Sequence, residues 1–143
     1  MMNLSFNSPS NTANNNVRFG YRSDLKRIVN AGAADCAYCE RPFTESNRAT
    51  LEHIRPHSKG GVSNVSNYLP VHARCNQIRG NEDFAPYIRT HQNKIGYIQN
   101  TLNELRGQII DGRDYVPAVA RTLNRESQGY TSFHGAIHKG INA

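Results

Sequence analysis

The pattern of apolar residues predicts one long helix in the second half of the chain. Apolar side chains recur there at steps of three and four residues, and His91 fills the one place that lacks an apolar residue. They are Phe84, Ile88, Ile95, Ile98, Leu102, Leu105 and Ile109. This spacing aligns them on one helix face, so we predict a helix from near Asp83 to near Gly107. That face can pack on the preceding part of the chain. Because the repeat is close to a heptad, it would also permit a homodimer.

Two shorter helices are predicted on either side of this segment. In the first, Ser23 is a suitable N-cap and Gly32 a suitable stop, with Leu25, Ile28 and Val29 on one face. In the second, Asp114 is a suitable cap, and the helix runs through Leu123. The chain is therefore expected to be helical at both ends of its ordered part.

Between the helices, the pattern predicts a β-hairpin. Residues 48–54 (RATLEHI) form the first strand and residues 67–71 (NYLPV) its partner, separated by a long loop that contains Pro56. Residues 72–80 (HARCNQIRG) have helical character, with Gly80 as the stop. The mixture of a hairpin and helices indicates an α+β fold.

The composition divides the chain into an arm and one domain. Residues 1–16 are rich in Asn and Ser and nearly free of charge, so we expect a disordered arm. Residues 17–110 are predicted to form the main domain, with its core motif at 36–80. Residues 111–143 are predicted to be a helical C-terminal extension and tail. A chain of 143 residues accommodates one ordinary domain.

The charge of the chain favours a polyanionic partner. Its formal net charge is +6, which suits either nucleic acid or an anionic membrane surface. No apolar run approaches the roughly 20 residues that span a bilayer, and the first residues lack the pattern of a secretory signal. We therefore expect a cytoplasmic protein with no membrane partner.

Two pairs of metal-binding residues occur at matching spacing. Cys36 and Cys39 form a C-x-x-C pair, and His72 and Cys75 form an H-x-x-C pair on the far side of the hairpin. Four such ligands complete a closed, tetrahedral Cys3His zinc site of structural type. The alternative is a redox-active pair at Cys36 and Cys39, which would require a βαβ pattern that this sequence lacks.

A second constellation surrounds Glu52 and His53. With Asn67 and Asn76 it completes a pattern that resembles the HNH family of nucleases, also called His-Me finger or ββα-metal nucleases, in the subtype braced by two zinc-binding pairs. The positions that carry the resemblance are Glu52, His53, Ile54, Pro56, Ser58, Gly60, Gly61, Asn67, Leu69, Cys75, Asn76 and Arg79. The resemblance implies a ββα-metal core with the zinc site, flanked by an N-terminal helix and the C-terminal extension.

The chemistry of phosphodiester hydrolysis suits these residue types. An imidazole such as that of His53 can take a proton from water at neutral pH, which makes it the candidate general base. By resemblance, Glu52 and Asn76 would hold one Mg2+ or Mn2+, for which their oxygen atoms are suitable ligands. Asn67 would brace the loop and orient the base. The family position of Glu52 is more often Asp, which puts metal preference in question.

The resemblance further implies a DNA endonuclease, most simply on double-stranded DNA, leaving 3′-hydroxyl and 5′-phosphate ends. Among the basic residues near the motif, we single out Lys59 and Arg79 as phosphate contacts. Two alternatives remain: a zinc-stabilised nucleic-acid-binding module without catalysis, and a ribonuclease. Small proteins of this family occur in phages, mobile introns and restriction or packaging systems.

Overall fold

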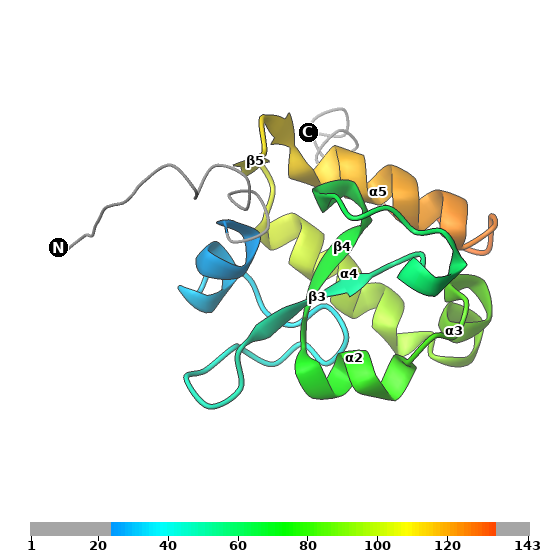
Figure 1. Cartoon of the computed structure of the whole chain (residues 1–143), viewed down its shortest axis with the longest axis horizontal. Helices are drawn as coiled ribbons and strands as arrows, with labels where there is room; N and C mark the ends of the chain where they lie inside the picture. Colours follow the sequence, from blue (N-terminus) through cyan, green and yellow to red (C-terminus); the bar gives the residue numbers. More distant parts are fainter. Residues whose placement is uncertain (1–23, 134–143) are drawn as a thin grey trace, which may run out of the picture.

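The structure is a computed structural model that describes residues 24–133 (Figure 1). The predicted arm at 1–16 lies outside these residues. Residues 24–30 are helical. They are followed by β3 (Ala49–His53), the 3-10 turns η1 (His57–Lys59) and η2 (Val65–Asn67), β4 (Tyr68–His72), α2 (Ala73–Arg79), α3 (Phe84–Thr90), α4 (Asn93–Glu104), β5 (Ile109–Ile110), β6 (Arg113–Asp114) and α5 (Tyr115–Glu126). In the described part of the chain, no helix has the length and apolar character needed to cross a membrane.

The predicted hairpin is confirmed. β3 and β4 pair antiparallel, with Ala49 opposite His72 at one end and His53 opposite Tyr68 at the other. The connection is long but tightly folded, because the amide of Gly61 donates to the carbonyl oxygen of Pro56 at 3.0 Å. A Cβ atom at Gly61 would lie 1.8 Å from the carbonyl oxygen of Arg55, so only glycine fits there. This close turn returns the loop to the end of β3.

The predicted helix after the hairpin is also confirmed. α2 follows β4 without a linker and ends at Gly80, which has a φ of +63°. Its amide caps the helix by donating to the Asn76 carbonyl oxygen at 3.0 Å. In Figure 1, α2 lies beside the crossed hairpin strands, completing a ββα unit.

The prediction of one long helix from Asp83 to Gly107 is wrong. The structure has two helices, α3 and α4, with a break at His91, the place that lacks an apolar residue. Side chains bond to the last carbonyls of α3 at this break: Thr90 Oγ1 donates to the Pro86 carbonyl oxygen at 3.0 Å, and His91 Nδ1 lies 2.9 Å from the Tyr87 carbonyl oxygen. Polar side chains that bond to the backbone in this way compete with helix continuation.

Ile109 also departs from the prediction, because it lies in β5 and is 64% exposed. β5 and β6 form a small hairpin that the apolar pattern did not indicate. Its turn consists of Asp111 and Gly112, whose φ angles are +55° and +72°. An Asp-Gly pair is well suited to such a turn, since both central residues require positive φ.

The predicted helices at both ends are confirmed, and they share one core. The first helix stops at Gly32, whose φ is +106°. α5 begins after Asp114, as expected, and Tyr115 Oη donates to the Tyr68 carbonyl oxygen at 2.5 Å. The core cluster extends from Leu25 to Phe133 and includes the apolar face of α4. That face therefore packs within the chain, which is the first of the two arrangements that its apolar pattern permits.

Candidate active site and metal centre

The two predicted zinc-binding pairs meet in space. The ligand atoms of Cys36, Cys39, His72 and Cys75 all lie within 4.8 Å of one another. Cys36 Sγ and Cys75 Sγ are 3.8 Å apart, and Cys39 Sγ is 3.3 Å from His72 Nδ1. Tetrahedral zinc with bonds of about 2.3 Å to sulfur requires a sulfur–sulfur distance of about 3.8 Å. The cluster is thus consistent with a zinc site.

Backbone groups orient these ligands. The amides of Tyr38 and His72 both donate to Cys36 Sγ at 3.4 Å. His72 Nε2 lies 3.1 Å from the carbonyl oxygen of Pro42. Because a carbonyl can only accept, this contact places the imidazole proton on Nε2 and leaves Nδ1 free to bind a metal. The backbone groups around the cluster therefore orient its ligands in a way that suits zinc.

Two thiols of the cluster, those of Cys36 and Cys75, hold their protons tightly when no metal is bound. Burial, followed by the nearby sulfur atoms, raises the pKa of Cys75 to about 12, and burial raises the pKa of Cys36. A metal ion binds the thiolate form, so it must displace these protons.

Glu52 is buried at the end of β3 and paired with Arg79. Its side chain is 4% exposed, that of Arg79 is 0% exposed, and Arg79 Nη1 lies 2.9 Å from Glu52 Oε2. Burial raises the pKa of Glu52, while the positive charge of Arg79 acts in the opposite direction. The expected phosphate contact by Arg79 is not compatible with this position, because a phosphate has no access to the buried guanidinium.

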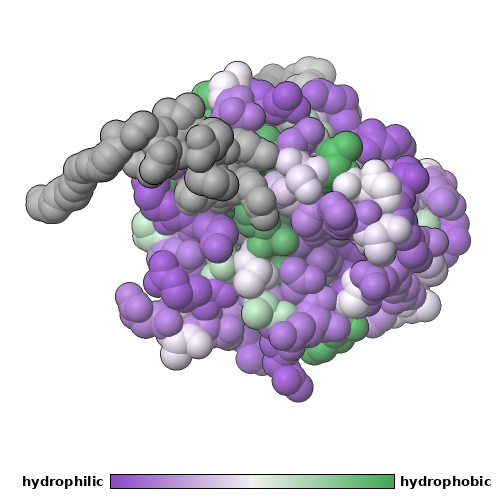
Figure 2. Space-filling view, in the orientation of Figure 1, coloured by the Kyte–Doolittle hydropathy of each residue, from purple (hydrophilic) through white to green (hydrophobic). Residues whose placement is uncertain are grey.

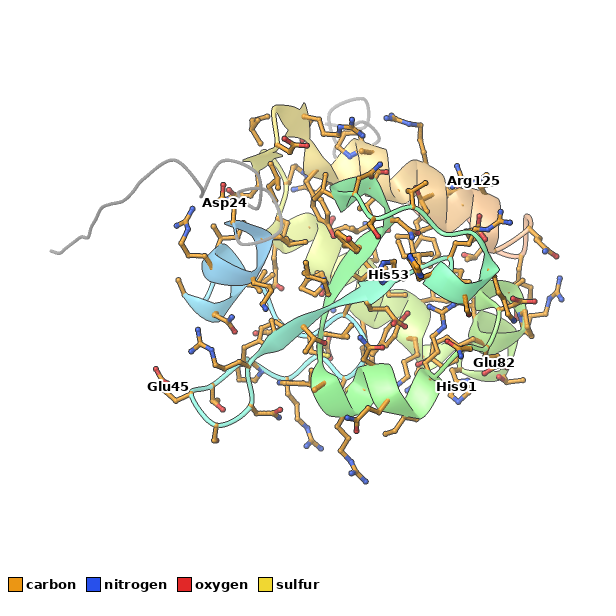
Figure 3. All side chains as sticks on the ribbon, viewed as in Figure 1. Asp24, Glu45, His53, Glu82, His91 and Arg125 are labelled. Atoms are coloured by element: carbon orange, nitrogen blue, oxygen red, sulfur yellow. The ribbon has the colours of Figure 1, made fainter. Side chains whose placement is uncertain are left out.

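His53 follows Glu52 but has different neighbours. Its ring meets that of Tyr68 edge-on, with centroids 5.0 Å apart, and the His57 ring is 5.9 Å away. Figure 3 shows His53 near the middle of the molecule, at the end of β3. One pocket of about 300 Å³ brings Glu52, His53 and Asn76 together, whereas Asn67, Lys59 and Arg79 do not line it. Its lining comprises Glu52, His53, Pro56, His57, Ser58, Asn76, Gly80 and Asn81.

Asn67 holds the backbone next to His53. Its Oδ1 accepts from the Arg55 amide at 2.9 Å, and its Nδ2 donates to the carbonyl oxygens of Arg55 and Val62 at 3.1 and 3.0 Å. Its own carbonyl oxygen accepts from the Ile54 amide at 2.9 Å. These contacts join the loop to the residues that come after the candidate base.

Lys59 lies on the loop surface, where a phosphate can reach it. Its side chain is 44% exposed, and Nζ lies 2.8 Å from Asp83 Oδ1. This ion pair lowers the pKa of the Asp83 carboxyl group. A phosphate would have to compete with Asp83 for the ammonium group.

Two residues that sequence reasoning did not place in the site border it. Tyr38 is fully buried between the zinc-binding pair and Glu52, and its hydroxyl oxygen lies 3.4 Å from Arg79 Nη1. His57, one of several basic residues near the motif in the sequence, lines the pocket beside His53. The sequence signal that could have identified His57 as a site residue is its position in the turn after Pro56, two residues before Lys59.

Comparisons with known proteins identify a family that this chain resembles. Residues 36–82 match the family model described as HNH endonuclease. The chain is 42% identical over 93 residues to the CRISPR-associated endonuclease Cas9 of Corynebacterium diphtheriae, an alignment that covers 63% of this chain and 8% of that protein. The chain thus spans less than a tenth of the length of this relative. No solved structure matches the chain. Residues 36–82 of this chain are an HNH endonuclease domain.

Proposed function

We propose that the chain is a metal-dependent endonuclease that hydrolyses phosphodiester bonds of DNA. The observation that carries this proposal is the pocket that Glu52, His53 and Asn76 line together. It places a candidate base beside two oxygen-bearing side chains, the combination that hydrolysis of a phosphodiester requires. The similarity to Cas9, which is named an endonuclease, supports the same reaction class.

In this proposal, His53 takes the proton from the attacking water. Its ring is held edge-on against Tyr68, and Asn67 fixes the backbone of the next two residues. A base held in one orientation loses little freedom when the substrate arrives, which lowers the barrier. Asn67 therefore acts through His53 and does not contact the reacting atoms.

The donor set suits a Mg2+ or Mn2+ ion. Glu52 offers a carboxylate, and Asn76 offers an amide oxygen on the first residue after the zinc-binding pair; hard divalent ions prefer such oxygens. Because Arg79 engages Oε2 of Glu52, Oε1 would be the oxygen left to bind such an ion. Such an ion would supply positive charge to the scissile phosphate.

We assign zinc at the Cys3His cluster a structural role. Four protein ligands would complete its tetrahedral coordination, so no position would remain for a substrate. The cluster joins the segment before the hairpin to the start of α2, which carries Asn76. Zinc would therefore hold the metal-binding helix against the strand that bears the base.

We propose double-stranded DNA as the substrate. The net charge of +6 favours a polyanion. Exposed basic residues occur in the loop that lines the pocket, and Lys59 is the one that we assign to a phosphate. The others are Arg55 and His57, of which His57 lines the pocket itself. One pocket per chain cuts one strand, so a double-strand break requires a second copy, as in a homodimer, or a second visit.

The test is cleavage of supercoiled plasmid by the purified protein with Mg2+, with Mn2+ and with EDTA. We expect nicking that requires the divalent ion and falls by at least about 100-fold in His53→Ala. The matched control is His91→Gln, a histidine outside the pocket whose replacement keeps a donor for the Tyr87 carbonyl.

Zinc content and circular dichroism establish that each variant is folded. A different outcome is that the wild type binds DNA and cleaves neither DNA nor RNA with any metal tested. That result would replace this proposal with a nucleic-acid-binding module without catalysis. Cleavage of RNA alone would make the protein a ribonuclease with the same site.

A further inference from the structure

We propose that Arg79 is a positioning residue that fixes Glu52 and the end of β3 for the reaction. This inference rests on the proposed function, and it assigns Arg79 a role other than the phosphate contact expected from the sequence. Arg79 ends α2, three residues after Asn76, and its side chain turns into the interior towards the strand that carries Glu52 and His53.

The guanidinium group contacts three consecutive residues of the strand end. Nη1 donates to Glu52 Oε2 at 2.9 Å and to the His53 carbonyl oxygen at 3.0 Å, and Nη2 donates to the Ile54 carbonyl oxygen at 2.7 Å. One rigid, planar group therefore bonds both the candidate metal ligand and the backbone of the candidate base. A fixed fork of donors is the geometry that arginine offers and lysine lacks.

The same group is itself immobilised from the other side. Nε and Nη2 both donate to the Glu82 carbonyl oxygen, at 3.1 and 2.8 Å. The guanidinium carbon lies 5.6 Å from the ring centroids of both Phe84 and Tyr87. Figure 3 shows Glu82 at the end of α2, where the chain turns towards α3. Contacts on both sides make Arg79 a fixed bridge from this turn to β3.

This bridge determines how Glu52 presents its oxygens. A glutamate has three rotatable side-chain bonds, so an unrestrained Glu52 would carry a large entropy cost when it is ordered around an ion. With Oε2 bonded to Arg79, the carboxylate is already ordered, and its negative charge is compensated in the buried site. Residues that orient a metal ligand in this way change metal affinity by about 10–100-fold when they are replaced.

The first experiment measures Mn2+ binding to zinc-loaded Arg79→Lys without DNA, using the electron paramagnetic resonance signal of free Mn2+. Lysine keeps the positive charge, so repulsion of the ion is unchanged and a change in affinity reports geometry. We expect Kd for Mn2+ to rise by at least about 10-fold. The matched control is Arg74→Lys on the exposed side of the same helix, which should bind Mn2+ as the wild type does.

Plasmid cleavage gives a second measurement on the same pair of variants. A positioning role predicts a lower kcat for Arg79→Lys at saturating Mn2+, with an unchanged KM for DNA. A phosphate contact predicts a raised KM. A purely structural role would lower thermal stability and leave the Mn2+ affinity of the folded protein unchanged. An unchanged affinity, or a change confined to KM, overturns the inference.

A third measurement uses only the wild-type protein, so it does not depend on whether a variant folds. In wild-type protein labelled with 15N, the buried guanidinium of Arg79 should give separate, slowly exchanging resonances. We expect Mg2+ to shift them and DNA without added divalent ions to leave them unchanged. Shifts caused by DNA but not by Mg2+ would indicate that Arg79 contacts a phosphate.

These results can be distinguished from failure of the proposed function. If the wild type binds no Mn2+ at this site, the proposed function and this inference fail together. If the wild type binds Mn2+ and Glu52→Gln abolishes binding while Arg79→Lys does not weaken it, only the inference fails.

Discussion

At the scale of single residues, the site combines strong burial with charge. Glu52 and Arg79 are almost inaccessible to solvent, and each compensates the other. A buried ion pair contributes little net stability, but removal of one partner leaves the other uncompensated, which is strongly destabilising. The pair therefore maintains the stability of the fold as well as the geometry of the proposed metal site.

We predict that Glu52→Gln lowers the free energy of unfolding by about 3 kcal/mol. The cause is the guanidinium of Arg79, which would keep its carbonyl partners but lose its counter-charge. Urea denaturation of the zinc-loaded protein measures the change. The control is Glu82→Gln, since that side chain is exposed and only its backbone carbonyl contacts Arg79. A loss below about 1 kcal/mol would mean that the carbonyls alone compensate Arg79.

The sequence predicted the ligand pairs and the pocket residues because their spacing is part of the motif. It could not place Arg79, since an arginine in a basic chain is usually exposed. Its burial depends on Phe84 and Tyr87, whose rings lie close to it only after α3 has folded back. Tyr38 escaped notice for a similar reason, because its contact with Arg79 spans 41 positions.

At the scale of elements, the β3–β4 hairpin, α2 and the first and last helices were predicted, whereas the long helix is divided in two and the β5–β6 hairpin was missed. Local signals specify the hairpin, α2, the stop of the first helix at Gly32 and the start of α5 after Asp114. The break between α3 and α4 depends on Thr90 and His91, whose side chains bond to the carbonyls of the preceding turn. A pattern of apolar residues contains no information about such bonds.

The loop between β3 and β4 provides a prediction at this scale. Gly61→Ala should lower stability by more than about 2 kcal/mol, since its Cβ atom would collide with the Arg55 backbone. The matched substitution, Gly96→Ala, adds a methyl group on α4 where no atom lies within 4 Å. It should raise stability by about 0.5–1 kcal/mol through helix propensity. Thermal melts of both variants measure the changes, and equal effects would contradict the loop geometry.

At the scale of the whole molecule, one core supports two polar centres. Apolar residues from both ends of the described chain meet in it, and the surface is mostly hydrophilic on the face shown in Figure 2. The Cys3His cluster lies at the Ala49–His72 end of the hairpin and the pocket at the His53–Tyr68 end. The hairpin thus separates the sulfur-containing cluster from the proposed site of oxygen ligands.

The cluster should lose zinc as the pH falls. Zinc binds the thiolate form, whereas the metal-free Cys75 thiol has a raised pKa and readily takes a proton. Protons therefore compete with zinc, and they do so more strongly at low pH. We expect retention at pH 8 and progressive release towards pH 5, measured with a chromogenic zinc chelator. Excess zinc should shift the release to lower pH, whereas release that does not respond to pH would contradict thiolate ligation.

The register of α2 limits the insertions and deletions that this domain tolerates. Cys75 is fixed at the start of the helix by the ligand cluster, and Arg79 at its end by β3, so Asn76 lies between two anchored points. Each added or removed helical residue rotates the later part of the helix by about 100°. A single insertion between Cys75 and Arg79 would turn the guanidinium away from Glu52, although every functional side chain would remain present. Length in this segment is therefore under tighter constraint than the identity of Gln77 and Ile78, whose side chains are exposed.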